Sequence, residues 1–165
     1  QATAQPACIL VSTRQKGNSM LKSISNATWK FADIQPDFIL GNSTGALYIS
    51  LRYHLLHPDY LYSRMSQVKR SDFKVRIILC MVDIENSTQP LILLTSLASA
   101  NDFTVILCWS PQECARYIET FKIYEYKSAD SIQARLETDY LPRVQDTLTV
   151  IRSVNRTDVA VLSKE

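Results

Sequence analysis

The sequence predicts an α/β domain in which helices flank a layered central β-sheet. Short apolar runs rich in β-branched residues alternate along the chain with longer segments whose apolar residues recur at helical spacing. The 165 residues are enough to bury a hydrophobic core, and a hydrophobic fraction of 46% is ordinary for a globular domain. No apolar run is long enough to cross a membrane, so no membrane association is expected.

Strands are expected where short apolar runs end at polar or glycine-containing turns. The first run is followed by a basic stretch, residues 12–18, in which Gly17 permits a turn. Trp29 and Phe31 are expected to anchor a loop. The predicted strands are residues 8–11, 20–24, 36–42, 46–54, 73–84 and 103–109.

Residues 46–54 alternate with a period of two, which is typical of a strand with one face in the core. The core face carries Leu47, Ile49, Leu51 and Tyr53. The opposite face carries Tyr48, Ser50, Arg52 and His54. A ring, a hydroxyl, a guanidinium and an imidazole in one row predict a contact surface.

Helices are expected between and after the strands. Pro58 suits the first turn of a helix that continues to about Val68, and residues 91–100 predict a buried helix. Ser110-Pro111-Gln112-Glu113 combines a capping hydroxyl, a proline in the first turn and a capping-box glutamate. The helix that follows has an apolar face formed by Tyr117, Ile118, Phe121 and Tyr124. A last helical segment, bent by Pro142, carries Ile132, Leu136, Tyr140, Val144, Leu148 and Ile151.

The segment that begins at Pro36 resembles a nuclease pattern in which a Pro-Asp dipeptide precedes a strand with an acid and a lysine. That chemistry needs at least two carboxylates for a divalent cation, and a lysine to stabilise the attacking water or the phosphate. Asp37 is present, but residues 38–52 contain no Asp, Glu or Lys. The positions of the acid and the lysine hold Leu47, Tyr48 and Ile49. The sequence therefore predicts the frame of a nuclease with a degenerate active site.

Other catalytic and metal-binding motifs are missing from the sequence. It has no phosphate-binding glycine loop, nucleophile elbow or HExxH motif, and no cofactor is expected. Surface or capping roles are favoured for His54, His57 and Asp83. The cysteines show no CxxC spacing and are predicted to be reduced core residues of an intracellular protein; they are Cys8, Cys80, Cys108 and Cys114.

Basic residues are interleaved with tyrosines in the first half of the chain. The net charge of +2 is too small to indicate nucleic-acid binding by itself. Cations that neutralise phosphates and rings that stack on bases do hold single strands. The spacing favours this function and a solvated basic surface about equally. The cations are Arg14, Lys16, Arg52, Arg64, Lys69 and Arg70, and the rings are Tyr48, Tyr53, Tyr60 and Tyr62.

Residues 45–60, which read GALYISLRYHLLHPDY, closely resemble the central domain of the excision repair cross-complementing group one family. This family is the non-catalytic subunit of the XPF-type structure-specific DNA-repair endonuclease. Further matching motifs occur in the same order at residues 14–18, 36–41, 109–113 and 153–158. Because several separated motifs match in order, the resemblance is specific and covers almost the whole chain.

The resemblance implies an XPF-like, restriction-endonuclease-like fold that has lost its active site and is not an enzyme. A groove in its place receives a peptide of the damage-verification protein XPA during nucleotide excision repair, and the same region is associated with single-stranded DNA. The implied groove residues are Arg14, Gln15, Gly17, Asn18, Tyr48, Ser50, Arg52, Tyr53, Leu56, Tyr60 and Arg64. The implied DNA-binding residues are Arg14, Lys16, Arg52, Arg64, Lys69 and Arg70. Tyr48 stands where the family usually has phenylalanine, so it adds a hydroxyl to the groove.

The family also has a C-terminal tandem helix-hairpin-helix domain that dimerises with the XPF-type catalytic subunit and binds duplex DNA. The resemblance implies that residues 8–152 form the central domain, and that residues 153–165 are a linker and the start of a truncated C-terminal domain. Residues 1–7 are expected to be disordered or artificial. The expected location is the nucleus.

Two alternatives stay open on the sequence alone. The first is an active metal-dependent, structure-specific nuclease with an unusual acidic site built from Asp37 and Asp83, with Asp59 as a further candidate. The second is a scaffold with an empty groove, in which Tyr53→Ala would change only stability.

Overall fold

The computed structural model describes residues 8–133 and 139–162, and it divides the chain into two compact units. The first unit ends at Lys127 and the second begins at Ser128. The first unit therefore ends before residue 152, the predicted end of the central domain. The predictions for residues 1–7 and for Leu136 fall outside the described residues.

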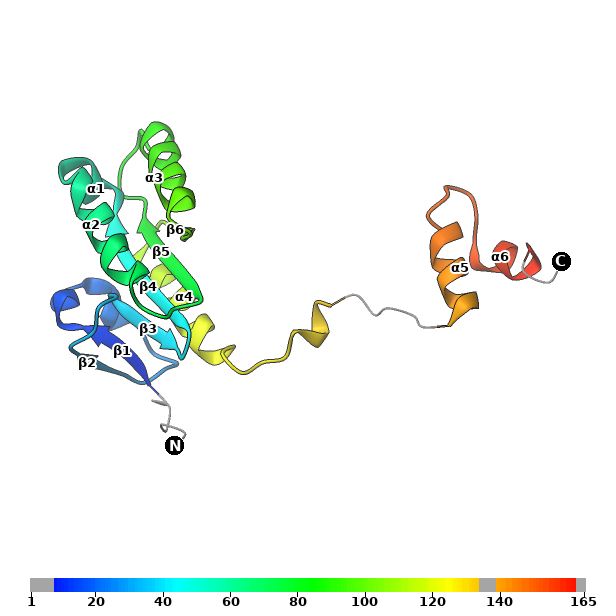
Figure 1. The fold of residues 1–165 in the computed structure, drawn as a ribbon, viewed down its shortest axis with the longest axis horizontal. Coiled ribbons are helices and arrows are strands. Elements are labelled where there is room, and N and C mark those ends of the chain that lie inside the picture. The colour runs from blue at the N-terminus through cyan, green and yellow to red at the C-terminus, as the bar shows by residue number, and fades with distance from the viewer. Residues whose placement is uncertain (1–7, 134–138, 163–165) are drawn as a thin grey trace. The chain divides into compact units, whose positions relative to one another are not determined.

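The first unit is built on a six-stranded sheet with the order β2-β1-β3-β4-β5-β6 (Figure 1). Strand β1 pairs parallel with β2 and antiparallel with β3, β3 pairs antiparallel with β4, and β4, β5 and β6 are parallel. The described part of the chain thus confirms the predicted mixed α/β class. The strands are β1 (Ile9–Ser12), β2 (Trp29–Ala32), β3 (Phe38–Gly41), β4 (Thr44–Ser50), β5 (Val75–Met81) and β6 (Thr104–Cys108).

Two hydrophobic clusters lie on the opposite faces of this sheet, because alternate strand residues point to opposite sides. Ala46 joins the cluster that contains the buried residues of α4 (Pro111–Ile123). Leu47, the next residue of β4, joins the cluster that contains the buried residues of α2 (Pro58–Lys69) and α3 (Thr88–Ala100). The sheet therefore lies between two layers of helices.

Two local predictions in the first half of the chain are wrong, whereas the predicted turn at Gly17 is present. Residues 20–24, expected to be a strand, lie largely in a 3-10 helix (Ser19–Ser23) that Asn18 caps by accepting the Met20 N–H at 3.0 Å. Trp29 and Phe31, expected in a loop, belong to strand β2. A second 3-10 helix, Thr13–Gln15, occupies part of the predicted basic turn, and Gly17 follows it with φ +87°.

The predicted strand 46–54 is correct only as far as Ser50. The chain then turns into helix α1 (Leu51–Leu56), so Arg52, Tyr53 and His54 lie on a helix. Ser50 starts this helix, because its Oγ accepts the Tyr53 N–H at 3.1 Å. The period of two continues by coincidence across the boundary, and Leu51 still reaches the core because the helix returns it there.

The other helices and strands are close to the predictions. Helix α2 buries Leu61, Arg64, Met65 and Val68, the spacing of one helical face. Helix α3 forms as predicted but is only partly buried, since Ile92 and Leu93 are exposed. Strand β6 is only partly buried because it lies at an edge of the sheet.

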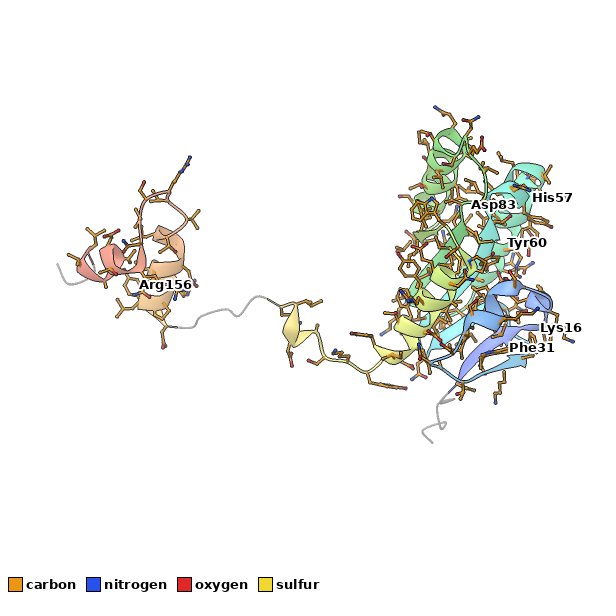
Figure 2. The ribbon with its side chains drawn as sticks, turned by 180° about the vertical axis from the view of Figure 1, so that it is seen from behind. Lys16, Phe31, His57, Tyr60, Asp83 and Arg156 are labelled. Carbon is orange, nitrogen blue, oxygen red and sulfur yellow. A yellow bond between two sulfur atoms is a disulfide. The ribbon has the colours of Figure 1, made fainter. Side chains whose placement is uncertain are left out.

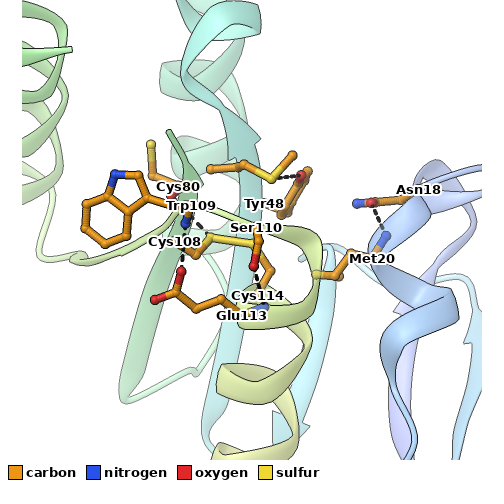
Figure 3. Close-up of a disulfide and its surroundings, with 10 residues drawn as sticks. Asn18, Met20, Tyr48, Cys80, Cys108, Trp109, Ser110, Glu113 and Cys114 are labelled. Atoms are coloured by element: carbon orange, nitrogen blue, oxygen red, sulfur yellow. Dashed lines mark hydrogen bonds between the residues drawn. A yellow bond between two sulfur atoms is a disulfide. The ribbon is translucent and has the colours of Figure 1, made fainter. Parts of the chain in front are cut away.

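Helix α4 begins at the predicted cap. Ser110 Oγ accepts the Glu113 N–H at 3.1 Å, while the Glu113 carboxylate accepts the Trp109 N–H at 2.8 Å rather than the N–H of the cap residue (Figure 3).

We expect Ser110→Ala to lower the free energy of unfolding by about 1 kcal/mol, because it removes the hydrogen bond that caps α4. Urea denaturation would measure the change. Gln112→Ala, at an exposed position of the same turn, is the control and should have little effect.

The prediction that all four cysteines are reduced is wrong for two of them. Cys108 and Cys114 form a disulfide (Figure 3), whereas Cys8 and Cys80 are free. Cys108 ends β6 and Cys114 lies in the first turns of α4, so the reversal of the chain brings their Cα atoms to 5.7 Å. Burial and the charge of Asp83 raise the pKa of the Cys80 thiol to about 12, which keeps it neutral.

The second unit contains a 3-10 turn (Ala129–Ser131) and two helices, α5 (Tyr140–Leu148) and α6 (Arg156–Leu162). Pro142 lies in the first turn of α5, where proline is tolerated, and so does not bend a longer helix as predicted. Within the described residues, no helix is both long and apolar enough to span a bilayer.

Candidate functional site

A buried ion pair joins Asp37 to Arg64, one of the predicted groove residues. Asp37, which precedes β3, is only 1% exposed, and its Oδ1 lies 3.1 Å from an Nη of Arg64 on α2. Its Oδ2 accepts the Tyr48 N–H at 2.9 Å. Arg64 also donates to the Gln35 carbonyl at 2.7 Å and to Gln67 Oε1 at 2.6 Å. Both carboxylate oxygens of Asp37 therefore bind groups of this chain.

Two groups of polar contacts hold predicted groove residues in place. The Asn18 side chain donates to Gln15 Oε1 at 2.9 Å and accepts the Met20 N–H at 3.0 Å. The Tyr48 hydroxyl lies 3.6 Å from Met81 Sδ on β5 (Figure 3). Two predicted groove residues, Gln15 and Asn18, are thus in contact, and Tyr48 is held by a residue of the next strand.

An aromatic group formed by Tyr53, His57 and Tyr60 lies at the junction of α1 and α2. The Tyr53 ring is 4.6 Å from the His57 ring and meets the Tyr60 ring edge-on at 5.2 Å between centroids. Tyr53 is 43% exposed, and Leu56, one turn further along α1, is 70% exposed. Figure 2 labels His57 and Tyr60, which lie toward the same margin of the first unit. The exposed rings of Tyr53 and His57, together with Leu56, offer apolar surface to a partner.

Tyr48 and Tyr60, the half-buried tyrosines among the predicted groove residues, keep their protons. Burial raises the pKa of Tyr48, and the negative charge of Asp83 raises it further. Burial also raises the pKa of Tyr60, as does the charge of Asp37, while Arg64 and Arg14 oppose this. Their hydroxyls therefore remain neutral hydrogen-bonding groups at physiological pH.

The predicted DNA-binding cations do not form one continuous surface. Arg14 is exposed and donates to the Ile34 carbonyl at 3.1 Å, and Lys16 is exposed nearby. Arg64 is 4% exposed and bound to Asp37, so its guanidinium does not face a ligand. Arg52 is held by Asp83, whose carbonyl accepts its Nη2–H at 2.9 Å.

The remaining two predicted cations lie at the other end of α2. Lys69 is 3.8 Å from a carboxylate oxygen of Asp102 in an exposed ion pair, and Arg70 caps the helix. About 15 Å of helix axis separates Arg70 from Tyr60. Any DNA bound by the whole predicted set would have to pass over α2.

The acidic residues of the nuclease alternative are not gathered into a site. Asp83 Oδ1 accepts the Arg52 N–H at 2.9 Å, and Asp59 is exposed in the first turn of α2. Among residues 8–133 and 139–162, no three His, Cys, Asp or Glu side chains are placed to hold a metal ion. The described geometry therefore gives no support to that alternative.

Comparison with known sequences decides the family. The family model described as the binding domain of the DNA-repair protein Ercc1 (rad10/Swi10) matches residues 6–128. The chain belongs to the Ercc1 (Rad10/Swi10) family. The matched segment covers β1 to α4, and so includes every predicted groove residue.

Curated relatives of the Ercc1 family match most of the chain. It is 53% identical to the DNA excision repair protein ERCC-1 of Arabidopsis thaliana over 93% of this chain and 37% of the relative. It is 45% identical to the mating-type switching protein swi10 of Schizosaccharomyces pombe over 94% of this chain and 62% of the relative. The chain therefore spans less than two thirds of either relative.

Solved structures confirm the nuclease-like fold of this Ercc1-family chain. XPF from Aeropyrum pernix has a TM-score of 0.62 at 12% identity, over 92% of this chain and 79% of that one. The same protein in complex with DNA has a TM-score of 0.69 at 10% identity, over 96% and 81%. At such low identity the likeness concerns the fold alone.

Several residues differ from the roles that the sequence predicted. His54 was assigned a capping or surface role but is only 9% exposed. His57 is exposed at the start of α2 as predicted, and its ring also packs on Tyr53. Asp37 was read as the remnant of a metal site, whereas it anchors Arg64 and β4. Met81 Sδ lies 3.6 Å from the Tyr48 hydroxyl and was not among the predicted site residues. A Pro-Asp dipeptide and a later arginine were the only signals of the buried pair.

Proposed function

We propose that this Ercc1-family domain is a non-catalytic recruitment module of a DNA-repair endonuclease. In this proposal its groove binds an extended peptide of an XPA-type damage-verification protein, and its exposed cations hold single-stranded DNA nearby. The observation that supports it most is the state of Asp37. Its two oxygens bind Arg64 and the Tyr48 main chain, so the one carboxylate that corresponds to the nuclease pattern is already occupied.

The groove supplies the groups that peptide recognition needs. Tyr53 and Leu56 offer exposed apolar surface, and Asn18 and Tyr48 offer neutral hydrogen-bonding groups that are held in place by Gln15 and Met81. Preorganised polar groups beside exposed rings are typical of the centre of a protein interface. We therefore assign affinity to the aromatic group and specificity to Asn18 and Tyr48.

The cations contribute orientation in this proposal. Arg14 and Lys16 flank the groove, whereas Lys69 and Arg70 would guide a strand along α2. Arg52 and Arg64 support the fold, because both are bound to residues of this chain. We further propose that the domain acts in the nucleus with an XPF-type catalytic subunit, through a tandem helix-hairpin-helix domain whose first part is residues 153–165.

Titration of an XPA-derived peptide into the chain tests the groove. We expect Tyr53→Ala to weaken binding by about 30-fold or more, because it removes a central aromatic contact. Asn18→Ala should also weaken binding strongly, because it removes a proposed groove amide together with its bonds to Gln15 and to the Met20 N–H. Fluorescence anisotropy of a labelled peptide, with circular dichroism of each variant, would give the affinities and verify folding.

The matched control is Tyr62→Ala, since Tyr62 is 55% exposed on α2 and lies outside the groove set. It should leave the affinity within about twofold of wild type. Loss of binding in all three variants, or no binding by folded wild type, would withdraw the peptide function. Cleavage of a labelled flap substrate with Mg²⁺ that Asp37→Ala abolishes would revive the nuclease alternative.

A further inference from the structure

We propose that the outer edge of strand β2 binds an extended acidic peptide of a partner protein as an added β-strand. This surface consists of Trp29, Lys30 and Phe31 on β2, together with Lys16 beside Phe31. It contains none of the proposed groove residues, although Lys16 is also one of the cations proposed to flank the groove.

Strand β2 is an edge strand. It ends the sheet order and pairs with β1 alone (Figure 1). The Ile9 N–H donates to the Thr28 carbonyl at 2.9 Å, and Ile9 is in register with Trp29. In a parallel ladder, this hydrogen bond and register place the main-chain N–H and C=O of Lys30 toward β1. The N–H and C=O groups of Trp29 and Phe31 then point to the open side of β2. No described residue outside the ladder bonds to the main chain of Trp29 or Phe31. An extended chain therefore finds two free donors and two free acceptors at this edge.

The side chains of the edge offer apolar contact. Trp29 and Phe31 point to the same face, and their rings meet edge-on at 5.2 Å between centroids. Trp29 packs on the hydrophobic core, which fixes the pair, while Phe31 is 40% exposed. Lys16 Nζ lies 5.9 Å from the Phe31 ring centroid, and Figure 2 shows the two side chains together at one margin of the first unit. The exposed ring can cover an apolar residue of an added strand.

The charge around the edge selects the occupant. Residues 8–35 contain four basic residues, Arg14, Lys16, Lys22 and Lys30, and one acidic residue, Asp33. Lys30 is exposed on β2 itself, on the face opposite to Phe31. A second copy of this chain paired edge to edge would bring two such basic surfaces together, and lysine on an edge strand opposes that pairing. An acidic peptide is attracted instead.

The geometry also predicts the pattern of the peptide. Because strand side chains alternate, residues on the Lys30 face should be acidic and residues on the Phe31 face should be apolar. Main-chain bonds then supply affinity, and the two faces supply specificity, as in other complexes formed by strand addition.

A synthetic peptide of about ten residues with alternating glutamate and valine is a suitable probe. Titrated into the full 165-residue chain, it should slow amide hydrogen exchange at Trp29 and Phe31, the two open-side amides, without an equal effect on Lys30. A control peptide carries N-methyl groups on two adjacent central amides, which point to the two opposite edges of the peptide strand. Whichever edge faces β2, one amide can then no longer donate, so this peptide should bind at least about tenfold more weakly. Lys30→Glu should weaken binding about three- to tenfold, from the loss of cross-strand charge pairing.

Lys74→Glu is the charge-matched control, because Lys74 is exposed and lies outside β2; it should not change the affinity by more than about twofold. Equal binding of the methylated and unmethylated peptides would overturn the proposal, since main-chain pairing would then be absent. Protection of the same amides by a ten-nucleotide oligothymidine, with none by the peptide, would overturn it in favour of a nucleic-acid surface. Neither result would affect the peptide groove, whose variants leave β2 intact.

Discussion

Replacement of Arg64 by alanine is expected to lower the free energy of unfolding by about 3–5 kcal/mol. The side chains of Arg64 and Asp37 are 5% and 1% exposed, so truncation of the arginine leaves a buried carboxylate without its counter-charge. The Gln35 carbonyl, which accepts from Arg64 at 2.7 Å, loses its partner as well. Chemical denaturation followed by circular dichroism would measure the loss.

A double-mutant cycle separates the ion pair from other effects. Asp37→Ala alone should also be strongly destabilising, because it leaves a buried guanidinium. The double variant should lose much less than the sum of the two single losses. Arg70→Ala, which truncates an exposed arginine at the end of the same helix, is the control and should cost less than about 1 kcal/mol. A loss below about 1 kcal/mol for Arg64→Ala would show that the pair is solvated in solution.

The same pair explains how a nuclease frame can serve as a binding domain. In a nuclease, a carboxylate at the start of this strand must remain free for a cation. Here α2 supplies an arginine from 27 positions away and satisfies that carboxylate within the fold. Asp37 also accepts the Tyr48 main-chain N–H, so the pair is connected to a predicted contact residue.

Hydrophobic periodicity predicted most of the fold because it reports burial directly. Strand β5 and helices α2 and α4 were recognised from buried positions at strand or helical spacing. The boundary of β4 was not, because Leu51 and Tyr53 continue the alternation after the strand has ended. The signal that could have placed it is Ser50, a capping residue directly before the helix. Strand β2 was missed because four residues are too few to show a period.

The site depended more on long-range contacts, which the sequence alone does not reveal. The resemblance supplied the groove residues, and contacts now join Gln15 to Asn18 and Tyr53 to Tyr60. It did not indicate that Arg64 is buried, since arginine is usually exposed and its partner lies on a different element. The disulfide was missed for the same reason: a separation of six positions matches no common motif, and only the turn before α4 brings the cysteines together.

The second large effect is expected at Glu119 on α4, which is 4% exposed. Its carboxylate accepts the main-chain N–H groups of Ser25 and Asn26 at 2.5 and 2.6 Å and the Asn26 side-chain amide at 3.2 Å. These bonds attach the segment between the 3-10 helix Ser19–Ser23 and β2 to α4. Glu119→Gln should lower the free energy of unfolding by about 1–3 kcal/mol, because an amide has one acceptor oxygen and adds a donor that faces other donors.

The pH dependence of this loss identifies its cause. Burial alone would raise the pKa of Glu119, but the bonds from Asn26 and Ser25 and the charge of Arg116 outweigh burial and lower it below its usual value. A carboxyl group whose folded pKa is lowered stabilises the protein fully above its unfolded pKa of about 4.3, and loses that contribution as the pH falls toward the folded pKa. The difference in the free energy of unfolding between wild type and Glu119→Gln should thus be constant from about pH 6 to 8 and shrink below about pH 4.5.

Urea denaturation at several pH values would test this, with Glu85→Gln, which replaces an exposed acid, as the control. A difference that does not change between pH 6 and pH 3.5 would mean that the loss comes from side-chain packing and not from the charge of Glu119.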